Sequence, residues 1–386
     1  MDLDRIIAVI VLMAGSSTLA DAQELAARYH AEKAINPLGE AVFVVVELAN
    51  ISSRTVQFDD GPCAQRFSPV VPIKQRSTDK LYGCAGEGTG GSCLGSFVEL
   101  KPGEKLSRRY LLPDGLEPDA AGDFDYTVER EITFYARDGS HKVVDRQEVR
   151  GTFTIHAVQA NHTQLEADYA PLVAHLQSRD PLQRALAASA ITQHPQEFLE
   201  PVILRLSRDP QTMVASITGL KKLGTVRAKQ RLAELTASGY EEYVRQPATT
   251  ALAELGDSTY CELMLQLMNL RQGYTSEIAA KGAGLLCGEK AIPQLVSLLS
   301  RKPSTFPAYE IAYALGNTGS RTAVPILIEL LGHADAGIHR AAKEALYTLT
   351  HWESNSDGSG ADHQNWVSWW ALEGKTAQIF DPTECP

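Results

Sequence analysis

Hydrophobic residues in the C-terminal half of the chain recur with the spacing of helices that bury one face. Two well-separated segments share the i, i+3, i+4, i+7 stripe of a helix with one apolar side. The matching positions are Val244, Pro247, Ala248, Ala251, Leu252 and Leu255 in the first segment and Ile338, Ala341, Ala342, Ala345, Leu346 and Leu349 in the second. We therefore expect two equivalent helices of a repeated unit.

A similar stripe precedes each of these helices, so the repeated unit is a pair of helices. One such stripe consists of Ile292, Leu295, Val296 and Leu299. Turn-forming pairs such as Asp180-Pro181 and Asp209-Pro210 divide the copies and recur about every thirty residues, which is the period of a solenoid. Residues 166–351 are predicted to form an all-α solenoid of six helical hairpins. The alternative is an unrelated helical bundle with chance periodicity.

Glycine-ended runs at the close of the second helices resemble those of HEAT repeats, in particular the short bacterial kind. The runs are Leu220-Lys-Lys-Leu-Gly224, Ala251-Leu-Ala-Glu-Leu-Gly256 and Ala314-Leu-Gly316. The first copy ends at His194 without the glycine, and the fourth has Cys287 in place of the last leucine. The resemblance covers about half of the chain and implies an α-solenoid with a long surface for a partner.

The N-terminal part alternates between apolar and polar residues, as strands with one buried side do. Strands are predicted over residues 42–48, 106–112, 126–135 and 152–156, separated by turn sequences such as Lys101-Pro-Gly103. Residues 23–158 are therefore expected to form a β-sandwich, with a closed barrel as the alternative. The stretches Val46-Glu-Leu-Ala-Asn50 and Gly122-Asp-Phe-Asp-Tyr126 resemble immunoglobulin-like accessory domains of secreted bacterial proteins. A polar linker over residues 159–165 is expected to separate the two domains.

Residues 1–22 have the features of a secretory signal peptide. Residues 6–14 form an apolar core that is too short to span a bilayer, and Ala20-Asp-Ala22 offers the small side chains that signal peptidase requires. The flanking charges are unusual, because Asp2 and Asp4 outnumber Arg5. We expect an exported protein, periplasmic or secreted, without a stable membrane span in the mature chain. An uncleaved anchor and a buried N-terminal helix are the alternatives.

The charge balance and the absence of catalytic motifs narrow the function. The net charge is −11 and the basic residues form no cluster, so nucleic acid is not expected as a partner. The ten histidines are scattered, and the sequence contains no His-x-x-x-His, Gly-x-Ser-x-Gly or phosphate-loop motif. We therefore expect no catalytic residue, no metal and no cofactor.

Six cysteines in an exported chain permit disulfides. Cys261 and Cys287 lie at nearly equal distances from the turn at Gly273-Tyr274, so antiparallel helices would bring them to the same end of a hairpin. A bridge forms if the Cα atoms come within about 7 Å, and two separately buried thiols are the alternative. Cys84 with Cys93 is the preferred pair in the N-terminal domain, leaving Cys63 and Cys385 to pair or stay free.

The C-terminal segment, residues 352–386, has three tryptophans, Trp366, Trp369 and Trp370, after a polar glycine-containing stretch that follows Trp352. Several HEAT-like bacterial proteins end in a similar way. The last hairpin of a solenoid has no neighbour to cover its apolar side, and large aromatic side chains can cover it. We expect an aromatic cap and a tail.

Second helices usually line the concave face of a solenoid. The candidate partner-binding residues near the starts of these helices are Arg184, Arg245, Gln246, Tyr309, Glu310, His339 and Arg340. For Arg184 and Arg340, the alternative is a bond to a neighbouring repeat.

The sequence predicts a non-enzymatic interaction or scaffold module of the cell envelope that binds a protein along the concave face. Three alternatives remain: an accessory subunit of an envelope enzyme complex, a cryptic enzyme with a site between sandwich and solenoid, and a purely structural envelope protein. Some HEAT-like proteins act as lyases on bilin chromophores, but those are cytoplasmic, whereas this chain has the features of an exported one.

Overall fold

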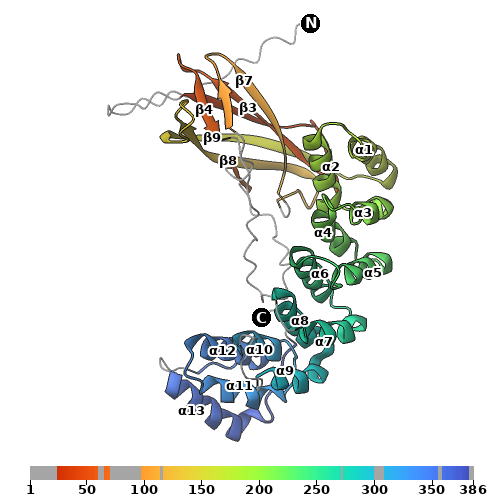
Figure 1. Ribbon diagram of the computed structural model, residues 1–386, viewed down its shortest axis with the longest axis vertical. Coiled ribbons are helices and arrows are strands. Elements are labelled where there is room, and N and C mark those ends of the chain that lie inside the picture. Colours follow the sequence, from red (N-terminus) through yellow and green to blue (C-terminus); the bar gives the residue numbers. More distant parts are fainter. Residues whose placement is uncertain are drawn as a thin grey trace.

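A computed structural model describes residues 24–59, 65–69, 97–113, 116–270, 273–299, 308–354 and 359–381. A region of strands comes first along the chain and a region of helices follows it (Figure 1). The predicted order of strands and helices is therefore confirmed. The expected signal peptide, residues 1–22, lies outside the described residues.

The sheet region consists of two sheets. The first contains β1 (Leu25–Ala31), β3 (Phe43–Asn50) and β7 (Lys105–Leu111), in the order β1-β3-β7. The second contains β2 (Asn36–Pro37), β9 (Val143–Val158), β8 (Gly122–Tyr135), β4 (Val56–Asp59) and β6 (Phe97–Leu100) in that order, with β5 (Gln65–Pro69) on β8. Only β2 and β9 pair in parallel among the described strands.

The alternation seen in the sequence determines which sides of the strands are buried. Val44, Val46 and Leu48 on β3 are almost inaccessible to solvent, and so are Tyr126 and Val128 on β8. These side chains belong to one hydrophobic cluster that draws on both sheets. A strand period of two places every second side chain on one face, so apolar residues at every second position give each sheet one side for the shared core.

The helical region contains thirteen α-helices among the described residues. They are α1 (His162–His175), α2 (Pro181–Gln193), α3 (Glu200–Leu206), α4 (Met213–Leu223), α5 (Val226–Leu235), α6 (Glu242–Glu254), α7 (Cys261–Met268), α8 (Tyr274–Cys287), α9 (Ile292–Leu299), α10 (Ala308–Gly316), α11 (Ala323–Leu331), α12 (Ala336–Thr350) and α13 (Ser359–Trp369). Helices α1 to α12 form six successive hairpins (Figure 1). The predicted α-solenoid is confirmed. The turn-forming pairs, however, lie inside the hairpins rather than between them.

Capping side chains and a left-handed glycine explain where several helices begin and end. The side chain of Asp180 accepts a hydrogen bond from the Leu182 amide at the start of α2, and Asp335 accepts from Gly337 and Ile338 at the start of α12. Such caps satisfy amides that have no partner within the helix. Gly224 ends α4 with a φ of 60°, a conformation that glycine adopts without steric cost.

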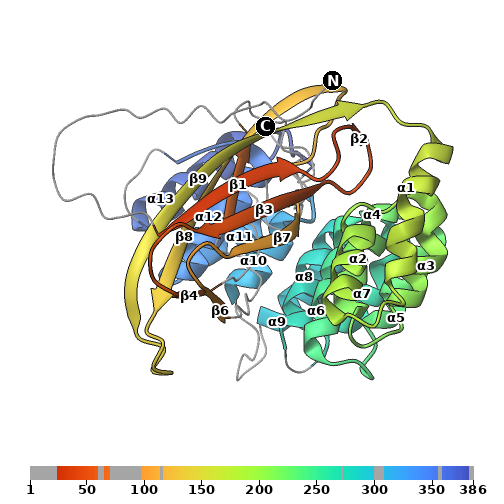
Figure 2. The same cartoon turned by 90° about the horizontal axis from the view of Figure 1, so that it is seen from above.

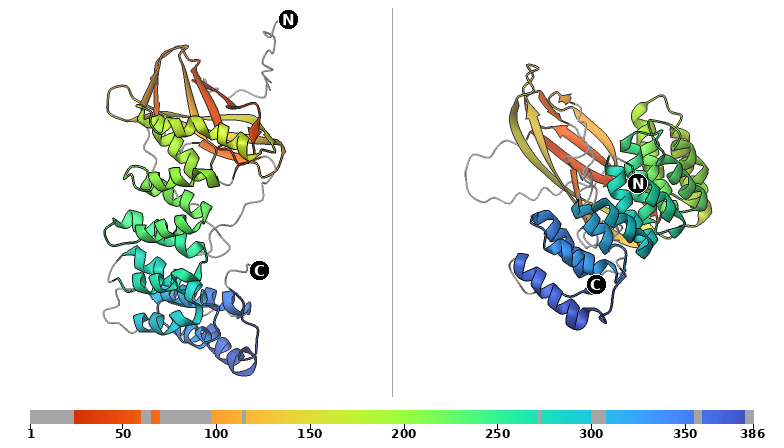
Figure 3. Two further views of the ribbon diagram at one scale, coloured as in Figure 1. Left: turned by 90° about the vertical axis from the view of Figure 1, so that its right-hand side faces the viewer. Right: turned by 60° about the horizontal axis from the view of Figure 1, so that its bottom comes forward.

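The second helices of the hairpins lie along the inner side of an arch, and the first helices lie along the outer side (Figure 1). The sheet region extends over α10 to α13 when the molecule is seen from above (Figure 2), and the hairpins stack in one continuous row (Figure 3). Most of their buried side chains belong to one hydrophobic cluster. Each hairpin therefore buries its apolar faces against its neighbours, as solenoid repeats must.

Glycines allow neighbouring inner helices to approach closely. A Cβ atom at Gly284 of α8 would collide with the carbonyl oxygen of Ala314 on α10, and one at Gly316 of α10 would lie 2.8 Å from the Cβ atom of Ala345 on α12. A stack whose inner helices pack more closely than its outer ones must curve towards the inner side. The small residues therefore contribute to the arch.

The sheet and helical regions share direct contacts, and the connection between them is shorter than expected. Helix α1 begins at His162, because Asn161 caps it by accepting a hydrogen bond from the Gln164 amide. Residues 162–165 are thus helical, and the prediction of a linker over residues 159–165 is wrong in this part. The single proton of the Tyr169 hydroxyl is shared between the carbonyl oxygens of His194, at 2.7 Å, and Gly39, at 3.2 Å, and the contact with Gly39 links the two regions.

Helix α13 packs against α11, where the sequence suggested an aromatic cap. Trp366 and Trp369 are buried and join the hydrophobic cluster of the solenoid. Trp352 stacks on Trp369 with ring centres 5.0 Å apart. None of the helices in the described part of the chain is both long and apolar enough to cross a bilayer.

Candidate functional site

The candidate residues Arg184 and Arg245 are engaged in the turns of their own hairpins. Arg184 donates from Nη1 to the carbonyl oxygens of Ser178, at 2.7 Å, and Arg179, at 3.1 Å. Arg245 donates from Nε to the Thr236 carbonyl at 3.2 Å. Both therefore stabilise a hairpin turn. Gln246 is half-buried beside Arg245 on α6.

Glu310, one of the two candidate residues on α10, takes part in a series of polar contacts across three inner helices. Lys281 Nζ of α8 lies 2.7 Å from Glu310 Oε2 of α10, and both side chains are largely buried. The Tyr313 hydroxyl of α10 donates to Glu344 of α12 at 2.7 Å. The same lysine ammonium lies 5.5 Å from the centre of the Tyr313 ring, within the range of a cation–π interaction.

Two exposed tyrosines and one carboxylate lie next to this series of polar contacts on α8 and α10. Tyr274 of α8 is 65% exposed and Tyr309 of α10 is 41% exposed. Glu277 lies one helical turn beyond Tyr274, and Lys281 lies one turn further, so the three residues share one side of α8. We call Tyr274, Glu277, Tyr309, Glu310 and Tyr313 the tyrosine–glutamate row.

The electrostatics of the row are dominated by carboxylates. Burial, followed by the charge of Glu310, raises the pKa of Glu277; Lys281 lowers it and Glu242 raises it further. Burial and the hydrogen bond to Glu344 raise the pKa of Tyr313 to about 12. The pKa of Tyr309 is also raised, first by desolvation and then by Glu310 and Glu277. Carboxylates therefore act on each of these three residues, and they are opposed by Lys281 at Glu277 and by Arg340 at Tyr313.

The two candidate residues on α12 have different surroundings: one is exposed at the surface, and the other faces α13 at the end of the solenoid. Arg340 is exposed. His339 Nε2 lies 3.7 Å from Asp362 of α13, a buried carboxylate that also accepts a hydrogen bond from Lys343 Nζ at 3.0 Å. His339 therefore faces α13, whereas Arg340 remains available to a partner.

Sequence reasoning missed most of the row. It found Tyr309 and Glu310 but omitted Tyr274, Glu277 and Tyr313. The signal was present, because exposed tyrosines recur near the starts of successive second helices, at Tyr243 and Tyr274 as well. Tyr274, Glu277 and Tyr313 share one side of their helices with other residues of the row but do not share one aligned column of the repeats.

A second polar cluster lies between the sheet region and α1. A cavity of about 310 Å³ is lined by residues from both regions, among them Lys33, Glu40, Arg109, Asp168 and His175. Lys33 Nζ forms ion pairs with Glu40 and Asp168. Burial raises the pKa of Glu40 although Lys33 opposes the shift, and the bonds to Glu40 and Asp168 raise the pKa of Lys33 against its own desolvation. The cluster ties the end of the sheet region to the first hairpin.

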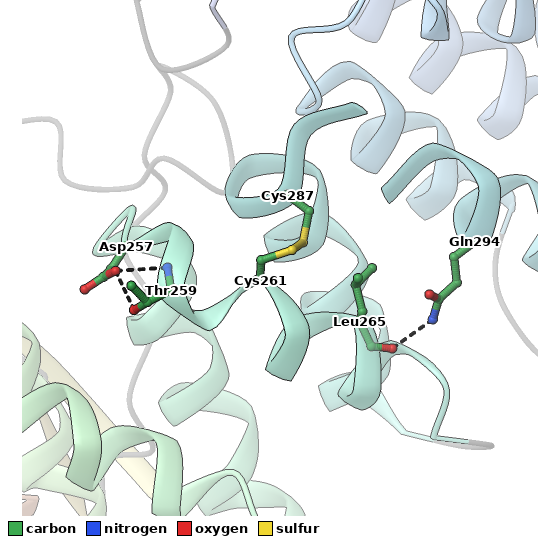
Figure 4. The surroundings of a disulfide bond; sticks show 6 residues. All are labelled: Asp257, Thr259, Cys261, Leu265, Cys287 and Gln294. Atoms are coloured by element: carbon green, nitrogen blue, oxygen red, sulfur yellow. Dashed lines mark hydrogen bonds between the residues drawn. A yellow bond between two sulfur atoms is a disulfide. The ribbon is translucent and has the colours of Figure 1, made fainter. Parts of the chain in front are cut away.

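Cys261 and Cys287 lie at the same end of the α7–α8 hairpin, with Cα atoms 5.0 Å apart and their sulfur atoms bonded (Figure 4). Next to them, Gln294 Nε2 donates to the Leu265 carbonyl at 2.8 Å and connects α9 to α7 (Figure 4). This Cα distance lies within the limit of about 7 Å that a disulfide requires. The pairing itself remains a prediction that chemical tests can check. Cys84 and Cys93, the other disulfide candidates, lie outside the described residues.

No metal site accompanies these clusters in the part of the chain that the structure describes, where no three His, Cys, Asp or Glu side chains are grouped to hold an ion.

Comparison with known proteins identifies the helical region. A family model described as HEAT repeats matches residues 169–253 and 261–347. The chain contains HEAT repeats. The resemblance drawn from the glycine-ended runs is confirmed by this match.

One curated relative is an enzyme subunit. The phycocyanobilin lyase subunit alpha of Picosynechococcus sp. is 31% identical over 118 residues, which cover 28% of this chain and 44% of the relative. The chain thus spans less than half the length of that relative. A solved structure, the complex of CpcE and CpcF of phycocyanin lyase from Nostoc sp. PCC7120, is 21% identical over 50% of this chain and 67% of that chain, with a TM-score of 0.29.

The curated relative contradicts two predictions made from the sequence. The chain was expected to be a non-enzymatic scaffold and not to be an enzyme, whereas the curated relative is named as a subunit of a lyase. The alternative of an enzyme-complex subunit agrees better with this finding. Motif searches could not have revealed this, because they detect residues that are close in the sequence, whereas a solenoid can bring together side chains from successive repeats.

Proposed function

We propose that this chain is an accessory subunit of an enzyme complex and that it holds a protein partner against the tyrosine–glutamate row. The partner is the catalytic subunit or the protein on which the complex acts. The relationship to a lyase subunit supports the class of function.

The observation that carries this proposal is the exposure of the row. Tyr274 and Tyr309 expose large rings beside half-buried carboxylates on helices that a continuous core holds in place. Exposed aromatic residues on a rigid scaffold are typical centres of protein interfaces, because they bury a large area with little loss of conformational freedom. The junction cavity, in contrast, is occupied by its own ion pairs.

Export of the chain is part of the same proposal. The apolar segment at residues 6–14 and the predicted disulfide between Cys261 and Cys287 support it, because disulfides persist in oxidising compartments. The complex would therefore act in the periplasm or outside the cell.

The experiment is purification of the tagged chain from its own host, with identification of the proteins that accompany it. We expect an enzyme in the complex whose kcat/KM falls when the chain is removed and recovers when the chain is added back. A Glu277→Gln, Tyr274→Leu double variant should restore less activity than the wild type. A stable complex without any enzyme would contradict the proposal.

The relative suggests a first ligand for the assay. Phycocyanobilin can be added to the purified complex, and binding would change the absorbance of this open-chain tetrapyrrole. An absorbance change that requires both the chain and its enzyme partner would mean that the complex binds the same ligand as the relative is named for. An unchanged spectrum would mean that the two proteins share only the role of a subunit of an enzyme complex.

A further inference from the structure

We infer that the partner inserts a lysine or arginine side chain between Tyr274 and Tyr309, where its charge is neutralised by Glu277. This inference rests on the proposed function, since it names the chemistry of the partner at the same row. The occupant is an extended, basic segment of a polypeptide.

The row already binds one cation of its own in the same way. The ammonium group of Lys281 lies 2.7 Å from a carboxylate oxygen of Glu310 and 5.5 Å from the Tyr313 ring centre. A tyrosine face and a glutamate together hold a cation more strongly than either does alone, because the ring quadrupole and the carboxylate both attract positive charge. Glu277 and Tyr309 offer the same pair of groups one helical turn before Lys281 and Tyr313, and Tyr274 lies one further turn before Glu277 on α8.

Glu277 has no cationic partner of its own in the described part of the chain. Lys281 is the basic residue that acts on it, and this lysine is paired with Glu310. The other groups that act on Glu277 are Glu310 and Glu242, and both are acidic. Glu242 is itself engaged, since it accepts hydrogen bonds from the amide and hydroxyl of Thr275 at 2.6 and 2.8 Å. An incoming cation would therefore relieve repulsion among three carboxylates.

The chemistry favours a side-chain cation over a metal ion. Hard metal ions require several oxygen ligands at close range, and the described residues contain no such cluster. Two exposed rings beside one carboxylate suit a large organic cation, and a basic polypeptide segment can also contact further tyrosines on neighbouring repeats, such as Tyr243 on α6, which is 64% exposed.

The test uses three fluorescein-labelled octapeptides in which glycine alternates with lysine, arginine or glutamate. Their binding to the full chain is followed by fluorescence anisotropy at low ionic strength, where exposed charges are not screened. The lysine and arginine peptides should bind, and the glutamate peptide should not. Glu277→Gln and Tyr274→Leu should each weaken the binding by roughly fivefold, whereas Tyr274→Phe should retain it.

The matched control is Glu262→Gln, which removes the same charge from an exposed site on the outer helix α7. Equal weakening by this variant would mean that the peptides respond only to net charge, and would overturn the inference. So would unchanged binding by Tyr274→Leu, or equal binding of the glutamate peptide. Thermal unfolding of each variant confirms that the fold is intact.

The two proposals can fail separately. If an enzyme accompanies the chain in its host but basic peptides ignore the row, the cation inference is wrong and the proposed function stands. If basic peptides bind as described but no enzyme accompanies the chain, the proposed function is wrong.

Discussion

Lys281 of α8 lies 2.7 Å from Glu310 of α10, and the two side chains are 12% and 13% exposed. This ion pair joins two successive repeats on the inner side of the arch, where the partner is proposed to bind. It belongs both to the framework of the solenoid and to the row, so its replacement should affect stability as well as electrostatics.

Lys281→Met should destabilise the protein by roughly 1–3 kcal/mol, because it leaves the largely buried carboxylate of Glu310 without its counter-ion. Glu310→Gln should cost a similar amount, and the double variant should cost less than the sum. The measurement is urea unfolding. The control pair is Arg146 and Glu131, whose side chains are 62% and 60% exposed. Because exposed ion pairs contribute little, replacing either residue should cost less than about 1 kcal/mol of stability. Equal effects at the two pairs would contradict this account.

Gly284→Ala should destabilise the solenoid by roughly 1–3 kcal/mol, because the new methyl group would collide with the Ala314 carbonyl. Alanine normally stabilises a helix relative to glycine by about 1 kcal/mol, so the sign of the effect is diagnostic. At the control position, Gly239, a new Cβ atom would meet no atom within 4 Å, and the same substitution should be neutral or slightly stabilising. Thermal unfolding of both variants compares them, and a stabilised Gly284→Ala protein would refute the close approach of α8 and α10.

The pKa of Asp257 is lowered to about 2, first by the hydrogen bond from Lys229 and then by those from Thr259. The folded pKa lies below the unfolded value of about 3.9, so the stabilising contribution is present above the unfolded value and is lost as the pH falls through the folded one. Lys229→Met should raise the pKa of Asp257 towards its ordinary value, as measured by carbon NMR titration. An unchanged pKa would mean that the lysine is not its partner in solution.

Cys261 and Cys287 should be found linked in the mature protein isolated from its host. Peptide mapping by mass spectrometry without reduction tests the link. Replacing both cysteines with alanine should lower the free energy of unfolding by about 3 kcal/mol, because the bond closes a loop with a sequence separation of 26 residues. Alkylation of both thiols without prior reduction would show that the cysteines are free.

The sequence was sufficient to predict the solenoid, because its cause is local. Apolar residues such as Ala342 and Leu346 lie on one side of their helix and are buried in the structure, and the repetition of that pattern predicts the stacking. The boundary at α1 was harder to predict, because it depends on the single cap at Asn161 within a polar stretch.

The candidate site was predicted only in part, because it depends on contacts between repeats. The side chains of Arg184 and Arg245 look available in the sequence, yet they bond to carbonyls of their own turns. The link between Tyr313 and Glu344 spans 31 positions in the chain, and spacing within one helix cannot reveal it.

The most direct test of the central claim is site-specific photo-cross-linking in the native host. A photoreactive phenylalanine derivative would replace Tyr274 on the row in one strain and Glu262 on the outer helix α7 in another. We predict that the chain cross-links to a subunit of an enzyme complex from position 274 and not from position 262. Cross-linking that is equal at the two positions, or that is confined to position 262, would contradict the claim that the tyrosine–glutamate row holds the partner.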